Sequence, residues 1–277
     1  MQAALLAPAM MIASGSIHAG VNAILKGGKD KMAGRATIDG SSAVLMLPAT
    51  LLVPLPAGAW GWLFATAFLH CAYLYALVRA FETSDFSAAY PILRGTAPLV
   101  TAAVAIGLLG EPANAREIAG IALIGAALFV MVGGRHISRA GLGWALFTGF
   151  TIAGYTVIDA QGVRAAPTPF SYIVWMFVLM GIATVTMFAL LSRGRIFASA
   201  RAQWRPGAAA GALSILTYGL ALSAFALGPT APLAALRETG MVTALLIATF
   251  VLKERVTVGR AVGVAGILGG AVLILTR

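Results

Sequence analysis

Two arginines lie inside apolar runs of the sequence, and their side chains have the chemistry to bind an anion. Arg94 stands in the stretch AAYPILRGTAPL, and Arg237 stands in a second apolar run. Placing a guanidinium in hydrocarbon is costly, so such a residue faces a partner or a water-filled cavity instead of lipid. Because the planar fork of arginine matches a carboxylate, both arginines are candidate substrate ligands.

Acidic residues leave a second interpretation of the arginines open. Glu238 follows Arg237 directly, and Asp159 lies late in another apolar run. Buried charges are usually paired, so these carboxylates are also candidates for ion pairs that lock helices together. An ion pair that exchanges its partner for a substrate would serve both purposes.

Aromatic side chains inside apolar runs form a second group of candidate binding residues. A phenol ring offers both a stacking surface and a hydrogen bond, which suits an amphipathic metabolite. Ordinary packing between helices is the alternative role. The aromatic candidates are Tyr75, Tyr90, Tyr155, Trp175 and Tyr218.

Three titratable residues in apolar runs are candidates for proton coupling: His18, His70 and Asp159. Histidine titrates near neutral pH, although a hydrogen-bonded contact between helices is the alternative role. Asn22 lies one helical turn beyond His18 and extends a polar stripe, so it joins the candidate substrate ligands. The chain has one cysteine, Cys71, and no phosphate-binding GxxxxGK[ST] sequence, so we predict no metal, no cofactor and no built-in ATPase.

The composition predicts the environment in which these residues work. Of the 277 residues, 60% are hydrophobic and 10% are charged, and the mean hydropathy is +0.92. Soluble domains are about 45–50% apolar and about 25% charged, so the chain is predicted to be an integral membrane protein whose partner is the lipid bilayer. The net charge of +10 resides in short connections between apolar runs, which argues against nucleic acid as a partner.

The continuous apolar runs predict an all-α membrane protein with ten transmembrane helices. Each run reaches the length of about 20 residues that a spanning helix needs, and none shows the two-residue alternation of a barrel strand. The expected spans are 3–25, 38–57, 60–80, 86–110, 116–134, 141–162, 169–192, 207–228, 230–252 and 258–276.

An internal repeat divides the ten predicted spans into two sets of five. Shifting the chain by 143 residues aligns Arg94 with Arg237 and Glu111 with Glu254. We therefore expect one five-helix repeat in residues 1–138 and a second in residues 139–277. Because five is odd, the second copy enters the bilayer in the inverted orientation, which is a transporter architecture with its substrate site near the midplane.

The same features carry a resemblance to a known family. Each repeat ends its fourth span in LLGE or LKE, with Pro91 and Pro98 upstream in one copy and Pro229 and Pro232 in the other. The chain therefore resembles EamA-type members of the drug/metabolite transporter superfamily, and among them the ten-helix exporters of amino acids, including aromatic ones. That resemblance implies a central cavity lined by the fourth and ninth spans.

The distribution of Lys and Arg predicts how the chain lies in the membrane. Most of the nineteen basic residues fall in the connections between spans 1–2, 3–4, 5–6, 7–8 and 9–10. The positive-inside rule places these connections in the cytoplasm and both termini outside it. Members of the EamA family are commonly drawn with cytoplasmic termini, so the two orientations stay open. We expect location in the inner (plasma) membrane.

These observations favour a secondary transporter of small metabolites over other classes of protein. We expect a monomer that exports amino acids, or lets them diffuse, by alternating access through a central cavity. The alternatives are an intramembrane enzyme and a passive channel for small polar solutes. No HExxH or GxSxG sequence occurs, so we predict no catalytic residues and no enzymatic activity.

Overall fold

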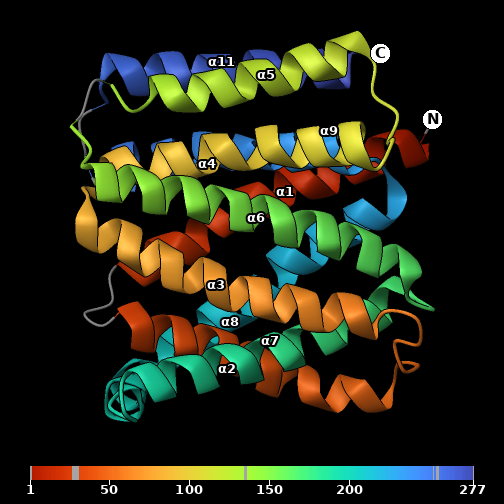
Figure 1. Ribbon diagram of the computed structural model, residues 1–277, viewed down its shortest axis with the longest axis vertical. Helices are drawn as coiled ribbons and strands as arrows, with labels where there is room; N and C mark the ends of the chain where they lie inside the picture. The colour runs from red at the N-terminus through yellow and green to blue at the C-terminus, as the bar shows by residue number, and fades with distance from the viewer. Residues whose placement is uncertain (1, 27–30, 134–135, 252, 254–255, 277) are drawn as a thin grey trace.

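The apolar runs of the sequence form helices that lie side by side in the computed structural model (Figure 1). The structure describes residues 2–26, 31–133, 136–251, 253 and 256–276, and the side chains of residues 2–4, 22–26, 31, 86–87 and 251 also lie outside the description. The α-helices are α1 (Gln2–Lys26), α2 (Lys31–Met46), α3 (Trp60–Thr83), α4 (Phe86–Ala102), α5 (Ala115–Val130), α6 (Arg139–Ala165), α7 (Pro169–Leu191), α8 (Ile196–Leu227), α9 (Thr230–Leu236), α10 (Gly240–Leu246) and α11 (Val258–Leu275).

Four short segments extend or interrupt these helices. Segments η1 (Leu47–Leu51) and η3 (Arg237–Thr239) are 3₁₀ turns, and η2 (Ala103–Leu108) and η4 (Ile247–Val251) are π-helical. The described part of the chain contains no strand. Seven of its helical segments are long and apolar enough to cross a bilayer, and a shorter apolar helix covers Leu5–Val21. The chain is therefore a multi-pass, all-helical membrane protein.

Two predicted spans differ from the helices in their bounds. The span expected at 38–57 is wrong in position, because α2 begins at Lys31 and ends at Met46 before the turn that Pro48 opens. The span expected at 207–228 begins eleven residues earlier, at Ile196. A hydropathy window excludes charged residues, whereas a helix continues through them when an i,i+4 pair such as Arg35 and Asp39 is buried together.

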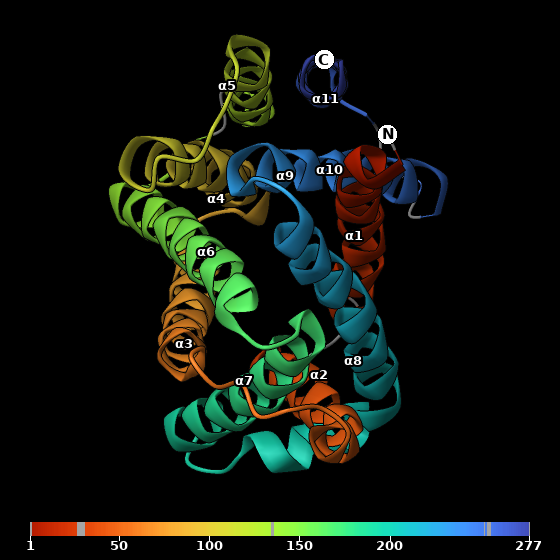
Figure 2. The same cartoon turned by 90° about the vertical axis from the view of Figure 1, so that its right-hand side faces the viewer.

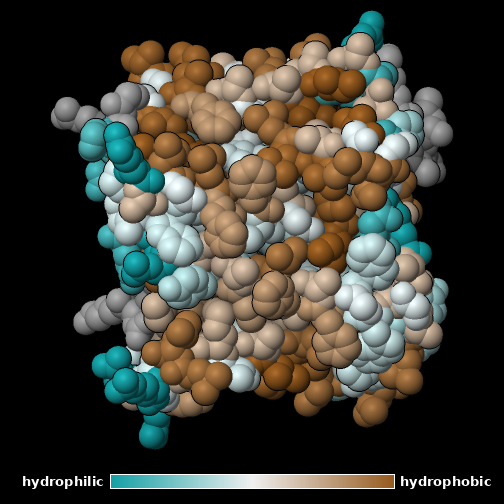
Figure 3. Space-filling view, viewed as in Figure 1, coloured by the Kyte–Doolittle hydropathy of each residue, from teal (hydrophilic) through white to brown (hydrophobic). Residues whose placement is uncertain are grey.

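Helices from the first half of the chain pack on helices from the second half. Helix α3 packs on α6, and α1 packs on α8; likewise α4 packs on α6, and α1 packs on the segment from α9 to α10. Viewed along the helices, α5 and α11 stand together at one end of the long axis (Figure 2). Hydrophilic side chains lie mainly at the left and right edges of Figure 3, where the helices end, and the middle of that surface is mostly apolar.

Local backbone features recur in the two halves at equivalent positions. The π-helical segments η2 and η4 end α4 and its counterpart, and each leads to a residue with positive φ, Gly110 at 67° and Lys253 at 54°. Asn114 then caps α5, and Thr257 caps α11, each accepting a backbone N–H through its side chain. Gly110 and Lys253, like Asn114 and Thr257, are 143 residues apart. Glu254, which the repeat aligns with Glu111, lies outside the described residues.

The pairing of α5 with α11 depends on glycines at the crossing, and one substitution tests it. A Cβ atom at Gly270 would lie 2.6 Å from the carbonyl oxygen of Gly120, whereas one at Gly269 would lie 3.5 Å from the Leu123 side chain. We expect Gly270→Ala to destabilise the purified protein by about 1–3 kcal/mol, because the helices must move apart. Thermal unfolding in detergent measures this loss, and Gly269→Ala is the control. Equal melting temperatures for the two variants would contradict the close contact.

Candidate functional site

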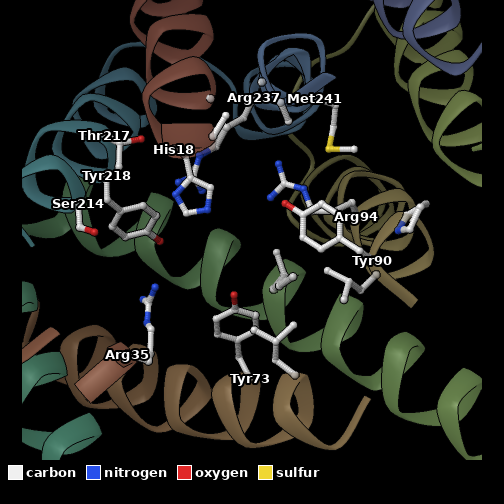
Figure 4. A pocket seen from close by; sticks show the side chains of 18 of the residues that line it. His18, Arg35, Tyr73, Tyr90, Arg94, Ser214, Thr217, Tyr218, Arg237 and Met241 are labelled. Carbon is white, nitrogen blue, oxygen red and sulfur yellow. The ribbon is translucent and has the colours of Figure 1, made fainter. Parts of the chain in front are cut away.

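A cavity of about 670 Å³ lies between the two halves of the bundle. Helices α1, α2, α3, α4, α6 and α8 and the segment from η3 to η4 contribute its walls. Figure 4 shows His18, Arg35, Tyr73, Arg94 and Tyr218 directed toward a common space. Polar side chains from distant parts of the chain therefore converge at the centre of an otherwise apolar protein.

Arg94 is held in the cavity wall by a carboxylate from the other half of the chain. Its Nε atom lies 2.8 Å from Oε2 of Glu238, and the exposed fractions of the two side chains are 12% and 6%. The Nε–H bond of Arg94 does not point at Oε2 of Glu238, so the contact is an ion pair without an aligned hydrogen bond. Glu238 therefore neutralises Arg94 and joins α4 to η3.

Arg237 occupies a different environment from Arg94. It begins the 3₁₀ turn that separates α9 from α10, and Gly15 of α1 packs against this break so closely that a Cβ there would collide with the Arg237 carbonyl. Its guanidinium carbon lies 5.1 Å from the centre of the Tyr218 ring. No described carboxylate lies within ion-pair distance of Arg237. The Tyr218 ring thus stabilises the guanidinium of Arg237 by a cation–π contact, and the guanidinium also lines the cavity.

Asp159 lies behind this aromatic face and does not line the cavity. Its two carboxylate oxygens accept hydrogen bonds from the hydroxyls of Tyr172, at 2.7 Å, and Tyr218, and its residue is 0% exposed. The carboxylate therefore fixes the ring on which Arg237 rests, and its negative charge is separated from the cavity by that ring.

An aromatic cluster forms the wall beside Tyr218. The rings of His70 and Tyr155 stack with centroids 4.0 Å apart, and Tyr73 meets Tyr155 edge-on at 5.6 Å. Nδ1 of His70 lies 2.9 Å from the carbonyl oxygen of Thr66, one turn earlier in α3, and this contact fixes the orientation of the imidazole. These rings line the cavity together with Tyr90 of α4.

Several residues expected at a binding site lie elsewhere. Tyr75 points away from the cavity, is 42% exposed and meets Trp144 edge-on at 5.9 Å. Trp175 packs edge-on against Trp60 at 5.3 Å and does not line the cavity. The side chain of Asn22 lies outside the described residues. The structure brings together Arg94, Arg237, Glu238, Tyr90, Tyr155, Tyr218, His18 and His70.

Arg35 lines the cavity together with Asp39, although it was not among the candidate residues of the sequence. It falls between the expected spans 3–25 and 38–57, yet it lies in α2 with its Nε 3.1 Å from Oδ2 of Asp39. The exposed fraction of the Asp39 side chain is 1%. The signal was present in the sequence: an Arg and an Asp four residues apart, flanked by Ala33, Ala36 and Ile38, predict a buried pair on one helix face.

The cavity extends toward one end of the bundle. Its lining includes Phe81 and Asp85 near the passage from α3 to α4, and Ile247 and Arg260 near the passage to α11. This end, at the left in Figure 1, is the one where the sequence gathers most basic residues. No residue of the connections at the opposite end lines the cavity.

A hydrogen-bond network joins three connections at that opposite end. Arg164, at the end of α6, donates to Oε1 of Glu111 at 2.7 Å and to the carbonyl oxygens of Phe225 at 2.9 Å and Gly228 at 2.7 Å. Glu111 in turn accepts from the backbone N–H of Thr230 at 2.5 Å and from its hydroxyl at 2.7 Å. Glu111 thus anchors the connections at this end, and Arg164, which the sequence did not mark as a candidate residue, holds its carboxylate in place.

The described residues contain no group of three His, Cys, Asp or Glu side chains arranged to hold a metal ion. What the site offers instead is guanidinium groups, phenol hydroxyls and aromatic faces around a cavity of metabolite size. Pockets of about 300–1,000 Å³ are typical of small-molecule sites. The arrangement is suited to bind an amphipathic anion.

Comparison with known proteins agrees with this geometry. Residues 139–276 match the EamA-like transporter family, and no curated protein matches the chain significantly. Twenty-nine chains of solved structures match. One of them, described only as a crystal structure of a protein, superposes with a TM-score of 0.74 at 18% identity, covering 99% of this chain and 96% of that chain. The fold is therefore shared over the whole length.

Acidification tests the Glu111 anchor. Burial raises the pKa of the Glu111 carboxyl, but hydrogen bonds from Arg164 and Thr230 and the charge of Arg164 lower it more, so its net pKa lies below the usual value. Such a carboxyl stabilises the fold above its unfolded pKa of about 4.3, and this contribution is lost as the pH falls through the lower folded pKa. We expect Glu111→Gln to lower the melting temperature at pH 7, and the deficit to shrink below about pH 4.

Glu82 provides a matched control for this pH dependence. It also pairs with an arginine, with Nη1 of Arg79 at 2.8 Å from Oε2, but the two side chains are 42% and 50% exposed. Solvent-exposed pairs contribute little to stability, so Glu82→Gln should leave the pH profile of the melting temperature unchanged. A deficit of Glu111→Gln that is constant from pH 7 to pH 3 would contradict the assignment.

Proposed function

The chain carries an EamA-like transporter domain at residues 139–276, and from this we propose that it is a secondary transporter of small metabolites, amino acids or related carboxylates. Transport proceeds by export or facilitated diffusion through the central cavity. The observation that carries the proposal is Arg237, whose guanidinium faces the cavity on the ring of Tyr218 with no described carboxylate in ion-pair distance. A substrate carboxylate would complete its coordination.

Alternating access is the mechanism that the two ends of the bundle support. The cavity reaches one end, and the network of Arg164, Glu111 and Thr230 binds the connections at the other end. A passive channel would need a continuous path, whereas this network separates the cavity from the far end. An intramembrane enzyme is the less supported alternative, because EamA-family members are transporters and the cavity holds no described metal-binding group.

We also propose ten membrane spans arranged as two inverted repeats, residues 1–138 and 139–277. Two observations support it: positive φ and N-caps recur at an offset of 143 residues, each after a π-helical segment, and helices of one half pack on helices of the other. In this scheme α9 and α10 together form one discontinuous span. Such broken helices surround the substrate sites of many inverted-repeat transporters.

The proposed location is the inner (plasma) membrane, with a monomer as the functional unit. If the basic end is cytoplasmic, the cavity opens to the cytoplasm and both termini lie outside. Proton coupling through His18, His70 or Asp159 stays a prediction: the two histidines line the cavity, while Asp159 reaches it only through Tyr218. A flux that ignores an imposed pH gradient in proteoliposomes would exclude all three.

Removing the charge of Arg237 tests the proposed substrate ligand. We expect Arg237→Gln to reduce carboxylate counterflow in proteoliposomes by about 30-fold or more, because a buried charge-assisted hydrogen bond is lost. Arg201→Gln is the control, since this exposed arginine lies outside the cavity near its basic end. Wild-type counterflow by Arg237→Gln, with an unchanged melting temperature, would contradict the role.

Arg94 and Glu238 are tested as a pair. We expect Arg94→Gln and Arg94→Ala to destabilise the protein by about 3 kcal/mol, because Glu238 would stay buried without its partner. The double variant Arg94→Gln/Glu238→Gln should recover most of the melting temperature, because both charges are gone. Transport by this double variant then reports the role of Arg94 in binding: we expect flux to be lost even where stability returns. Full stability of the single variants would show that the ion pair does not hold the helices together.

A further inference from the structure

The deep part of the cavity presents guanidinium donors from three sides. Arg35, Arg94 and Arg237 all line it. Figure 4 shows Arg94 and Arg237 near His18, and Arg35 reaching toward the same space from the opposite side. The ion pairs of Arg35 and Arg94 engage the Nε atoms, at 3.1 Å from Asp39 and 2.8 Å from Glu238. The terminal nitrogens of both arginines point into the cavity (Figure 4). The cavity therefore offers an anion guanidinium donors on α2, α4 and η3.

The carboxylates in this region are already used or hidden. The side chains of Asp39 and Glu238 are 1% and 6% exposed and are paired with arginines. Asp159 is fully buried, accepts from Tyr172 and Tyr218, and is separated from the cavity by the Tyr218 ring. The exposed Asp85 stands where α4 begins, at the end of the bundle. Asp39 also lines the cavity, but Arg35 holds its Oδ2 and its other oxygen, Oδ1, is buried. Among the described residues, no carboxylate oxygen in the deep cavity is therefore exposed to a substrate ammonium group.

The remaining wall is aromatic and apolar. His70 stacks on Tyr155, Tyr218 lies edge-on to Tyr155 at 6.4 Å, and Phe177 lies edge-on to Tyr218 at 6.5 Å. Ile152 and Met180 also line this side of the cavity. Aromatic rings pack well in offset or edge-on arrangements with such a wall. A flat ring on the substrate would lie here while its anionic end reaches the arginines.

We propose that the cavity selects aromatic monocarboxylates that lack an amino group over the corresponding zwitterionic amino acids. This inference rests on the proposed function and narrows its substrate class. The physical reason is that the described residues of the deep cavity offer guanidinium donors but no exposed carboxylate. A substrate carboxylate gains charge-assisted hydrogen bonds, whereas a substrate ammonium group would be buried without a counter-ion. An amine without a carboxylate is excluded more strongly, because it would also meet the arginines' charge.

Three compounds that share a phenylethyl skeleton test this selectivity: 3-phenylpropionate carries only the carboxylate, 2-phenylethylamine only the ammonium group, and L-phenylalanine both. The full-length protein is reconstituted in liposomes, and counterflow and equilibrium binding are measured for each compound. We expect 3-phenylpropionate to bind at least about tenfold more tightly than phenylalanine, and 2-phenylethylamine to show no exchange.

The outcomes separate this inference from the proposed function. Equal or tighter binding of phenylalanine, with exchange, would overturn the selectivity and leave a carboxylate transporter intact. If neither carboxylate binds or exchanges, both the selectivity and the proposed carboxylate transport fail. Preferred exchange of 2-phenylethylamine would also overturn both, because the arginines would then not be the recognition groups.

A gain of specificity gives a second, independent readout. Ser214 of α8 lines the cavity near Tyr218, so Ser214→Asp adds an accessible carboxylate without removing any paired residue. We expect this variant to shift the phenylalanine to 3-phenylpropionate binding ratio at least about tenfold toward the amino acid. Ser214→Asn, of equal size and no charge, should keep the wild-type ratio. An unchanged ratio in a folded Ser214→Asp protein would overturn the inference.

Discussion

The structure depends on how a chain with few acidic groups holds arginines in the middle of an apolar bundle. A guanidinium cannot lose its proton in a protein, so its charge must be met by surrounding groups. Three different solutions occur around one cavity. Asp39 pairs with Arg35 on the same helix, Glu238 pairs with Arg94 across the two halves, and an aromatic face meets Arg237. Each solution fixes helices relative to the cavity.

Arg94 and Arg237 have separate parts in this arrangement. Arg94 lies in the continuous helix α4, and its ion pair with Glu238 draws η3 toward that helix. Arg237 lies at the break between α9 and α10, where Gly15 of α1 allows close approach. Similar sequences in the two halves thus give a structural clip in one place and an open donor in the other. This difference makes the polar groups of the cavity asymmetric.

Asp159 acts on Arg237 indirectly, because Tyr218 lies between the carboxylate and the guanidinium. By accepting from Tyr218 it holds the phenol ring, and the ring in turn supports Arg237. A direct contact between Asp159 and Arg237 would instead neutralise the guanidinium. At the far end of the bundle, the network around Arg164 satisfies carbonyl groups at the end of α8 and the first N–H of α9 through Glu111. Opening that end would require these groups to find other partners.

The sequence alone determined that this is a multi-pass helical membrane protein and that intramembrane arginines mark its centre. Those conclusions follow from apolar run length and from the rarity of buried charge, which are local properties of the chain. It did not determine where α2 begins, because the pair of Arg35 and Asp39 makes a polar segment compatible with burial.

Only the tertiary structure decided which polar residues meet. Glu238 stands beside Arg237 in the sequence yet pairs with Arg94, because successive residues of a helix point to different sides. Tyr75 and Tyr218 are both tyrosines inside apolar runs, but Tyr75 faces outward against Trp144 and Tyr218 faces the cavity. Spacing along the chain indicates which residues share a face of one helix. Which side chains of different helices contact each other depends on how the helices pack.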